Sequence, residues 1–181
     1  FWDFSYTATG DTKAFALIGC TETEYTLLDI FCRNCDISDA LYYHFTNAAK
    51  WLRKNASFIS YYDANVAQKA VYEILIHAAK KYRSIAIPLQ THNASEKYTK
   101  ISTTLQGAFG AGKFFFSRKL EEHPDWGEAS HQLFSFEKGS KVHDDFPDAL
   151  AEALIQAQLI FAVDTEDEDH EPIIKRKERG G

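Results

Sequence analysis

The sequence predicts an α/β domain in which a mixed β-sheet of five or more strands is flanked by helices. Three strand-like segments follow one another at the start of the chain, and short connections join them. Helical and strand-like segments then alternate, and a late helix follows. Neighbouring strands with short connections pair antiparallel, whereas a strand that is reached through a helix usually enters the same sheet in parallel. With 181 residues, of which 45% are hydrophobic, the chain can bury one sizeable core.

The first three strands are predicted from the spacing of apolar side chains. Residues 1–8 alternate, with Trp2, Phe4 and Tyr6 on one face and polar residues between them, which indicates a strand with one buried face. Apolar runs at 13–20 and 25–34 predict the second and third strands, joined as an antiparallel meander. Asp11 belongs to a Gly-Asp pair that suits the tight turn between the first two strands, so turn formation alone can explain it.

Periodicity also predicts the later elements. Asp36 or Ser38 can cap the first helix. Three antiparallel strands, followed by strands that enter through helical crossovers, match the ribonuclease H-like architecture. The predicted elements are helices over 36–55, 66–82, 94–106 and 127–136, strands over 57–64, 84–90 and 113–117, and a last helix that ends near Ile160.

Composition limits the class of protein. The net charge of −6 and the pI near 5.6 exclude a general basic coat for nucleic acid, but a nuclease whose metal ions neutralise phosphate locally stays possible. No apolar run approaches the roughly 20 residues that cross a bilayer, and no signal peptide is present, so we expect a soluble intracellular protein. Residues 1–163 are predicted to form the domain, and the charged, aperiodic residues 164–181 a flexible tail. Because the chain starts at Phe1 within a strand pattern, we expect a domain cut from a longer polypeptide.

Two motifs are set aside as sites. The pair Cys32 and Cys35 has zinc-ligand spacing, but no second pair lies nearby to complete four ligands, so these are interpreted as structural thiols. The stretch 107-GAFGAGKF-114 contains GxxxxGK without the following Ser or Thr, and it precedes a strand, so it is interpreted as a glycine turn. Lys113 in that turn is at most a phosphate contact.

Acidic residues that are far apart in the sequence are expected to meet at one edge of the sheet. Asp3 lies on the first strand, Asp63 ends the fourth, and the first and fourth strands become neighbours in this architecture. The stretch 143-HDDFPDALAEAL-154 places Asp144, Asp145 and Asp148 at the start of the last helix. Converging carboxylates can hold two Mg²⁺ or Mn²⁺ ions about 4 Å apart for phosphodiester cleavage.

Each of these acids also has a simpler interpretation. Asp144 or Asp145 can cap the helix, as Pro147 in the first turn suggests, although capping does not explain Asp148 one turn further on. Asp3 and Asp63 can be edge and turn residues. His143 can be an ordinary loop histidine, a metal ligand, a general base or a partner of a ligand. Capping and metal binding therefore both stay open.

Four segments together resemble the nuclease domain of the large terminase subunit of tailed phages. They are the first hairpin 2-WDFSYTATGDTKAFALIG-19, the strand-end acid in 58-FISYYDAN-65, the lysine-containing helix and strand 97-KYTKISTTL-105 and 112-GKFFFS-117, and the closing acidic motif 143-HDDFPDALAEAL-154. They cover nearly the whole ordered chain in the family's order. At the strand-end acid the family commonly has Glu where this chain has Asp63.

The resemblance implies an endonuclease that requires Mg²⁺ or Mn²⁺ and cuts concatemeric double-stranded viral DNA during packaging. Asp3 and Asp63 carry over as catalytic metal ligands, and Asp145 is the first choice for the third ligand before Asp144. The candidates for residues that contact the metal ligands without binding the metal are His143, Asp148 and Asp11. The candidate DNA-phosphate contacts are Lys97, Lys100, Lys113 and Arg118.

The resemblance also implies partners and a location. An N-terminal ATPase motor domain would precede this domain, a terminase small subunit and a portal would bind the complex, and the cytoplasm of a host bacterium would contain it. Two alternatives stay open: another ribonuclease H-like nuclease such as a junction resolvase, or a module that docks DNA or the portal without cleaving DNA.

Overall fold

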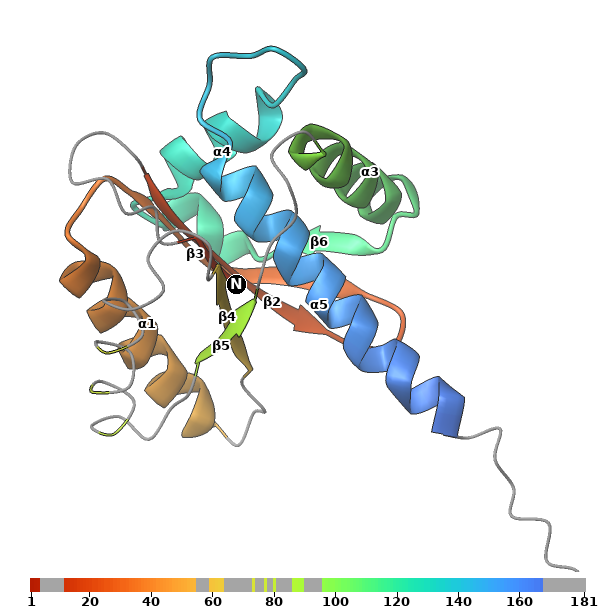
Figure 1. Ribbon diagram of the computed structural model, residues 1–181, viewed down its shortest axis with the longest axis horizontal. Coiled ribbons are helices and arrows are strands. Elements are labelled where there is room, and N and C mark those ends of the chain that lie inside the picture. The colour runs from red at the N-terminus through yellow and green to blue at the C-terminus, as the bar shows by residue number, and fades with distance from the viewer. Residues whose placement is uncertain are drawn as a thin grey trace, which may run out of the picture.

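The structure is a computed structural model, and it describes part of the chain (Figure 1). For residues 63, 86–89 and 161–167 only the backbone is described. The described residues are 1–3, 12–54, 59–63, 73, 77, 80, 86–89 and 96–167. The predicted turn at Asp11, most of the predicted helix over 66–82 and the tail from 168 lie outside them.

The described strands form one mixed sheet in the order β5-β4-β1-β2-β3-β6, so the predicted fold class is confirmed. The antiparallel meander consists of β1–β2 and β2–β3, and β4 pairs parallel with β1. β5 and β6 extend the sheet in parallel at its two edges. The strands are β1 Trp2–Asp3, β2 Lys13–Cys20, β3 Tyr25–Arg33, β4 Ser60–Asp63, β5 Ala86–Leu89 and β6 Phe114–Phe116.

The helices cover both faces of the sheet (Figure 1). Gly112, two residues after the end of α3 at Gly110, has a φ of 65°, a conformation that glycine adopts readily. α5 runs on past the predicted end near Ile160 to Asp167, and after Pro147 in its first turn no glycine or proline interrupts it. No described helix is both long and apolar enough to cross a membrane. The helices are α1 Ile37–Leu52, α3 Lys97–Gly110, the 3₁₀ helix η1 Arg118–Glu122, α4 Trp126–Phe134 and α5 Asp145–Asp167.

The two faces of the sheet bury different side chains. One face is aromatic and packs against α1: Trp2 stacks on Phe15 with 4.5 Å between ring centroids, and Phe31 and Phe45 lie in the same cluster. The other face is mainly aliphatic, and α3, α4 and α5 cover it with residues such as Leu154. Because side chains alternate along a strand, the β1 residue after Trp2 faces α5.

Candidate active site

Asp3 and Asp63 stand level at the ends of two neighbouring parallel strands. Trp2 of β1 is in register with Tyr62 of β4, so the next residue on each strand is Asp3 and Asp63 respectively. Asp3 also lies opposite Ala14 of β2, which belongs to the aliphatic face, so the Asp3 side chain faces α5. The structure therefore places these two predicted residues side by side, with Asp63 described by its backbone.

The start of α5 is tied to the rest of the domain through α4. The Phe146 N–H donates to Oε1 of Gln132 over 2.9 Å, and both side chains are fully buried. The Asp144 carbonyl accepts the Asp148 N–H at 2.9 Å, which makes Asp144 the residue at the helix boundary. α5 then packs across β1 and β2. The Gln132 side chain of α4 and the Asp144 carbonyl thus accept hydrogen bonds from two backbone N–H groups in the first turn of α5.

Lysines from α3 hold the acidic side chains of α5. Nζ of Lys97 lies 2.9 Å from Oδ1 of Asp144 and 3.4 Å from Oδ2 of Asp148. Nζ of Lys100 lies 2.7 Å from Oδ1 of Asp148 and 2.6 Å from Oε1 of Glu152. The three acids are spaced one helical turn apart, so they share one face of α5 and form a ladder with the two lysines.

The ladder changes the pKa values of its lysines. Burial alone would lower the pKa of Lys97, but Asp148, Asp144 and Asp3 outweigh burial and raise it above the ordinary value. The pKa of Lys100 is raised in the same way by Asp148 and Glu152, against the effect of burial. Both lysines are therefore held charged, and Asp3 of β1 adds to the effect of the α5 acids on the pKa of Lys97.

Asp145, the first choice for the third metal ligand, lies on a different side of the helix start. Its carboxylate helps burial to raise the pKa of the Cys32 thiol on β3. Nδ1 of His143, an exposed residue, lies 3.7 Å from Oδ2 of Asp145. Ala14 separates Asp3 from Cys32 in the register of the sheet, so Asp3 and Cys32 belong to one row across β1, β2 and β3.

The remaining predicted residues divide between two places. Lys97 and Lys100 contact the α5 carboxylates, and their predicted role at DNA phosphates stays a prediction. Lys113 and Arg118 flank β6, which pairs with Tyr25–Leu27 of β3. Cys32 marks the other end of β3, roughly 23 Å away at about 3.3 Å per residue.

Two residues of this site were missed by sequence reasoning. Glu152 is buried, and its position four residues after Asp148 was a usable signal, since such residues share a helix face. Gln132 had no comparable signal, because its partner Phe146 is 14 residues away across a turn that only the folded chain closes.

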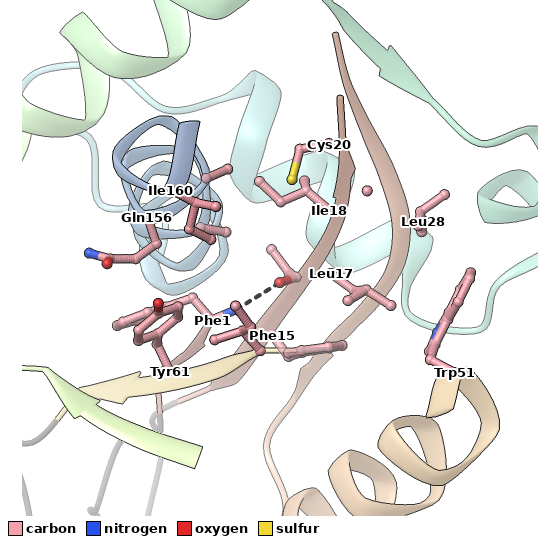
Figure 2. A pocket seen from close by; sticks show the side chains of 15 residues that line it. Phe1, Phe15, Leu17, Ile18, Cys20, Leu28, Trp51, Tyr61, Gln156 and Ile160 are labelled. Carbon is pink, nitrogen blue, oxygen red and sulfur yellow. Dashed lines mark hydrogen bonds between the residues drawn. The ribbon is translucent and has the colours of Figure 1, made fainter. Parts of the chain in front are cut away.

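A pocket of about 430 Å³ lies beside the last residues of β2 (Figure 2). The last residues of β2, Leu17–Cys20, line it together with Tyr61 of β4 and Gln156 and Ile160 of α5. Its lining is mostly apolar and contains no carboxylate. The pocket therefore does not belong to the acidic site.

The donor set at the acidic site suits a hard divalent cation. Carboxylate oxygens are the ligands that Mg²⁺ and Mn²⁺ prefer, and the ammonium group of Lys97 already lies among them. Among the residues whose side chains are described, no group of three or more Asp, Glu, His or Cys is arranged to hold a metal ion. The side chain of Asp63 lies outside that set.

Comparison with known proteins supports the fold. No protein-family model matches the sequence, and no curated protein sequence matches it. A solved structure that is similar is the terminase nuclease domain of human cytomegalovirus, soaked with manganese and bound to an inhibitor. The TM-score is 0.60 at 12% sequence identity, over 90% of this chain and 83% of that chain. The chain thus shares the fold of that terminase nuclease domain.

Proposed function

We propose that this domain is a metal-dependent endonuclease that hydrolyses double-stranded DNA, as the nuclease domain of a terminase large subunit. The phage origin, the concatemeric viral substrate and the hydrolysis with two metal ions are parts of the same proposal. The fold of a terminase nuclease domain supports it, as does the resemblance of four sequence segments to the phage family.

One observation carries the proposal. Asp3 and Asp63 end two adjacent parallel strands at the same level, and the acidic start of α5 lies at that end of the sheet. Stability does not require a carboxylate from each of three separate elements at one place, since like charges repel. Lys97 offsets part of that repulsion at Asp144 and Asp148, and a divalent cation shared by Asp3, Asp63 and Asp145 would offset the rest.

In this proposal Asp3, Asp63 and Asp145 hold the metal, and Asp144 is the alternative to Asp145 as the third ligand. When bound, two divalent ions supply water activation and neutralisation of the charge that develops on the phosphate oxygens. The chain's own residues orient the site: the β1–β4 register aligns Asp3 with Asp63, and Gln132 fixes the first turn of α5.

Partners and location follow from the same proposal. The domain would act beside an ATPase motor domain, with a terminase small subunit and a portal, in the cytoplasm of a host bacterium. Double-stranded DNA would be the substrate. Lys97 and Lys100, which already contact the α5 acids, are the nearest predicted cations for its phosphates.

Nicking of supercoiled plasmid with Mn²⁺, Mg²⁺ or EDTA tests the activity. We expect cleavage with a divalent ion and none with EDTA. Asp3→Asn should reduce cleavage by about 100-fold or more, the loss typical when a group that stabilises transition-state charge is removed. Asp39→Asn, which removes an exposed acid from the first turn of α1, is the matched control and should cleave normally. Full Mn²⁺-dependent activity in Asp3→Asn would refute the site.

The second candidate function is a module that docks DNA or the portal without cleaving DNA. It is favoured by the lysines Lys97 and Lys100, which can neutralise the α5 acids without metal. Calorimetric titration with Mn²⁺ separates the two. Binding at two or more sites that is lost in Asp63→Ala supports the nuclease, whereas no binding supports the docking module. Cleavage of branched DNA alone would instead indicate a junction resolvase.

A further inference from the structure

Among the described residues, no strand pairs with the outer edge of β6. β6 is last in the strand order and pairs with β3 on its inner side. The Lys113 carbonyl accepts the Tyr25 N–H at 2.8 Å, and the Ser117 N–H donates to the Leu27 carbonyl at 3.0 Å. Because backbone groups alternate in direction along a strand, the N–H and C=O groups of Phe114 and Phe116 point to the outer edge.

Exposed aromatic side chains surround this edge. The rings of Phe109 and Phe134 lie 6.1 and 6.3 Å from the ring of Phe116, and Phe114 lies 5.2 Å from it. The Phe134 side chain is 67% exposed, and Phe115, on the opposite face of the strand, is 45% exposed. A gathering of exposed aromatic residues marks a binding surface more often than a solvated one.

Positive charges stand at both ends of the same strand. Lys113 precedes β6, and Arg118 and Lys119 follow it, all exposed. Short edge strands are commonly protected by charge against unwanted pairing, but protection alone does not account for an aromatic surface beside the edge. In antiparallel pairing with a second copy of β6, Lys113 of one copy would lie beside Ser117 and Arg118 of the other, so like charges would oppose self-association.

We propose that β6 is a docking edge for an extended segment of a partner protein, which adds a strand to the sheet. The partner segment carries apolar side chains that pack on Phe109, Phe116 and Phe134, and acidic residues at its ends that face the three cations. Backbone hydrogen bonds to Phe114 and Phe116 supply affinity, and the aromatic surface supplies selectivity. The surface lies at the far end of β3 from the acidic site, so it does not depend on the proposed nuclease activity.

A short fluorescent peptide, in which valine and tyrosine alternate between acidic ends, is the probe. We expect saturable binding by fluorescence anisotropy with a Kd of about 10 to 100 μM, in the range of transient peptide recognition. The same peptide with N-methyl groups on alternate residues should not bind, because it cannot form the backbone hydrogen bonds with β6. A peptide with lysine ends should bind at least about 10-fold more weakly.

Variants of the protein test the surface itself. Phe134→Ser should weaken binding about 10-fold without unfolding the domain, because the side chain is mostly exposed. Leu159→Ser, an exposed position on α5, is the matched control and should bind normally. No binding at about 1 mM, or equal binding of the N-methylated peptide, would overturn the proposal. Self-association that Phe134→Ser abolishes would assign the edge to a second copy instead.

Discussion

The helices α1 and α5 begin alike in sequence and differ in what the fold makes of their first turns. Both start among aspartates: Asp36 and Asp39 in α1, and Asp144, Asp145 and Asp148 in α5. The α1 acids are exposed, and Asp36 makes no capping hydrogen bond through its side chain. The side chains of Asp145 and Asp148 are only 15% and 14% exposed.

This difference indicates that aspartates at a helix start can be present for two separate reasons. At α1 the exposed carboxylates complement the helix dipole in solvent, an effect of about 0.5 kcal/mol. At α5 the side chains of Asp145 and Asp148 are largely withdrawn from solvent, and Lys97 and Lys100 of α3 contact Asp144 and Asp148. Partly buried acids matched by cations from another element belong to a tertiary site.

Removal of Lys100 should have the largest effect on stability. Lys100→Met leaves Asp148 and the buried Glu152 without this cation, and we expect the free energy of unfolding to fall by about 3 kcal/mol, as when one partner of a buried ion pair is removed. Urea denaturation measures the loss. Asp39→Asn, in the first turn of α1, should change stability by only about 0.5 kcal/mol. A similar small change for both variants would mean that the two helix starts are equivalent.

Acidification should affect the α1 side of the sheet through His44. The His44 ring is buried and accepts a 2.7 Å hydrogen bond from Nε1 of Trp2, and burial lowers its pKa from 6.5 to about 3. Below pH 6.5 the unfolded chain binds a proton at this histidine and the folded chain does not. The contribution to stability is therefore complete above pH 6.5 and is lost progressively toward pH 3.

At pH 5 this linkage amounts to about 2 kcal/mol relative to pH 7. The measurement is the free energy of unfolding between pH 7 and pH 5. His44→Asn, which keeps an acceptor for Trp2, should show a flatter dependence, whereas His131→Gln on the exposed side of α4 should keep the slope of the wild type. An unchanged slope in His44→Asn would show that His44 does not carry the acid sensitivity.

Loss of the Gln132 cap should be the smallest of the three effects. Gln132→Met keeps most of the volume but leaves the buried Phe146 N–H without its acceptor, and we expect a loss of about 1.5 kcal/mol. Ser130→Ala on the same helix removes only an exposed hydrogen bond and serves as the control. Equal stability of both variants would show that α5 does not need a cap from α4.

Much of the architecture could be predicted because it follows from local patterns. Period-two alternation and apolar runs locate β2 and β3 to within a residue, and the helix periodicity locates α1, α3 and α4. The end of α5 was predicted too early, since the change to acidic residues near 164 suggested a break, whereas the helix continues to Asp167. The 3₁₀ helix η1 was not predicted, because one turn carries no periodic signal.

The sequence by itself determined the order of elements, the neighbourhood of β1 and β4 and the acidic character of the α5 start. These follow from hydrophobic period and from the rules that connect strands. Only the tertiary structure decided that Lys97 and Lys100 contact α5 and that Gln132 caps it. Such contacts depend on the packing of helices that are distant in the chain. The spacing of side chains along one helix does not specify which other helix packs against it.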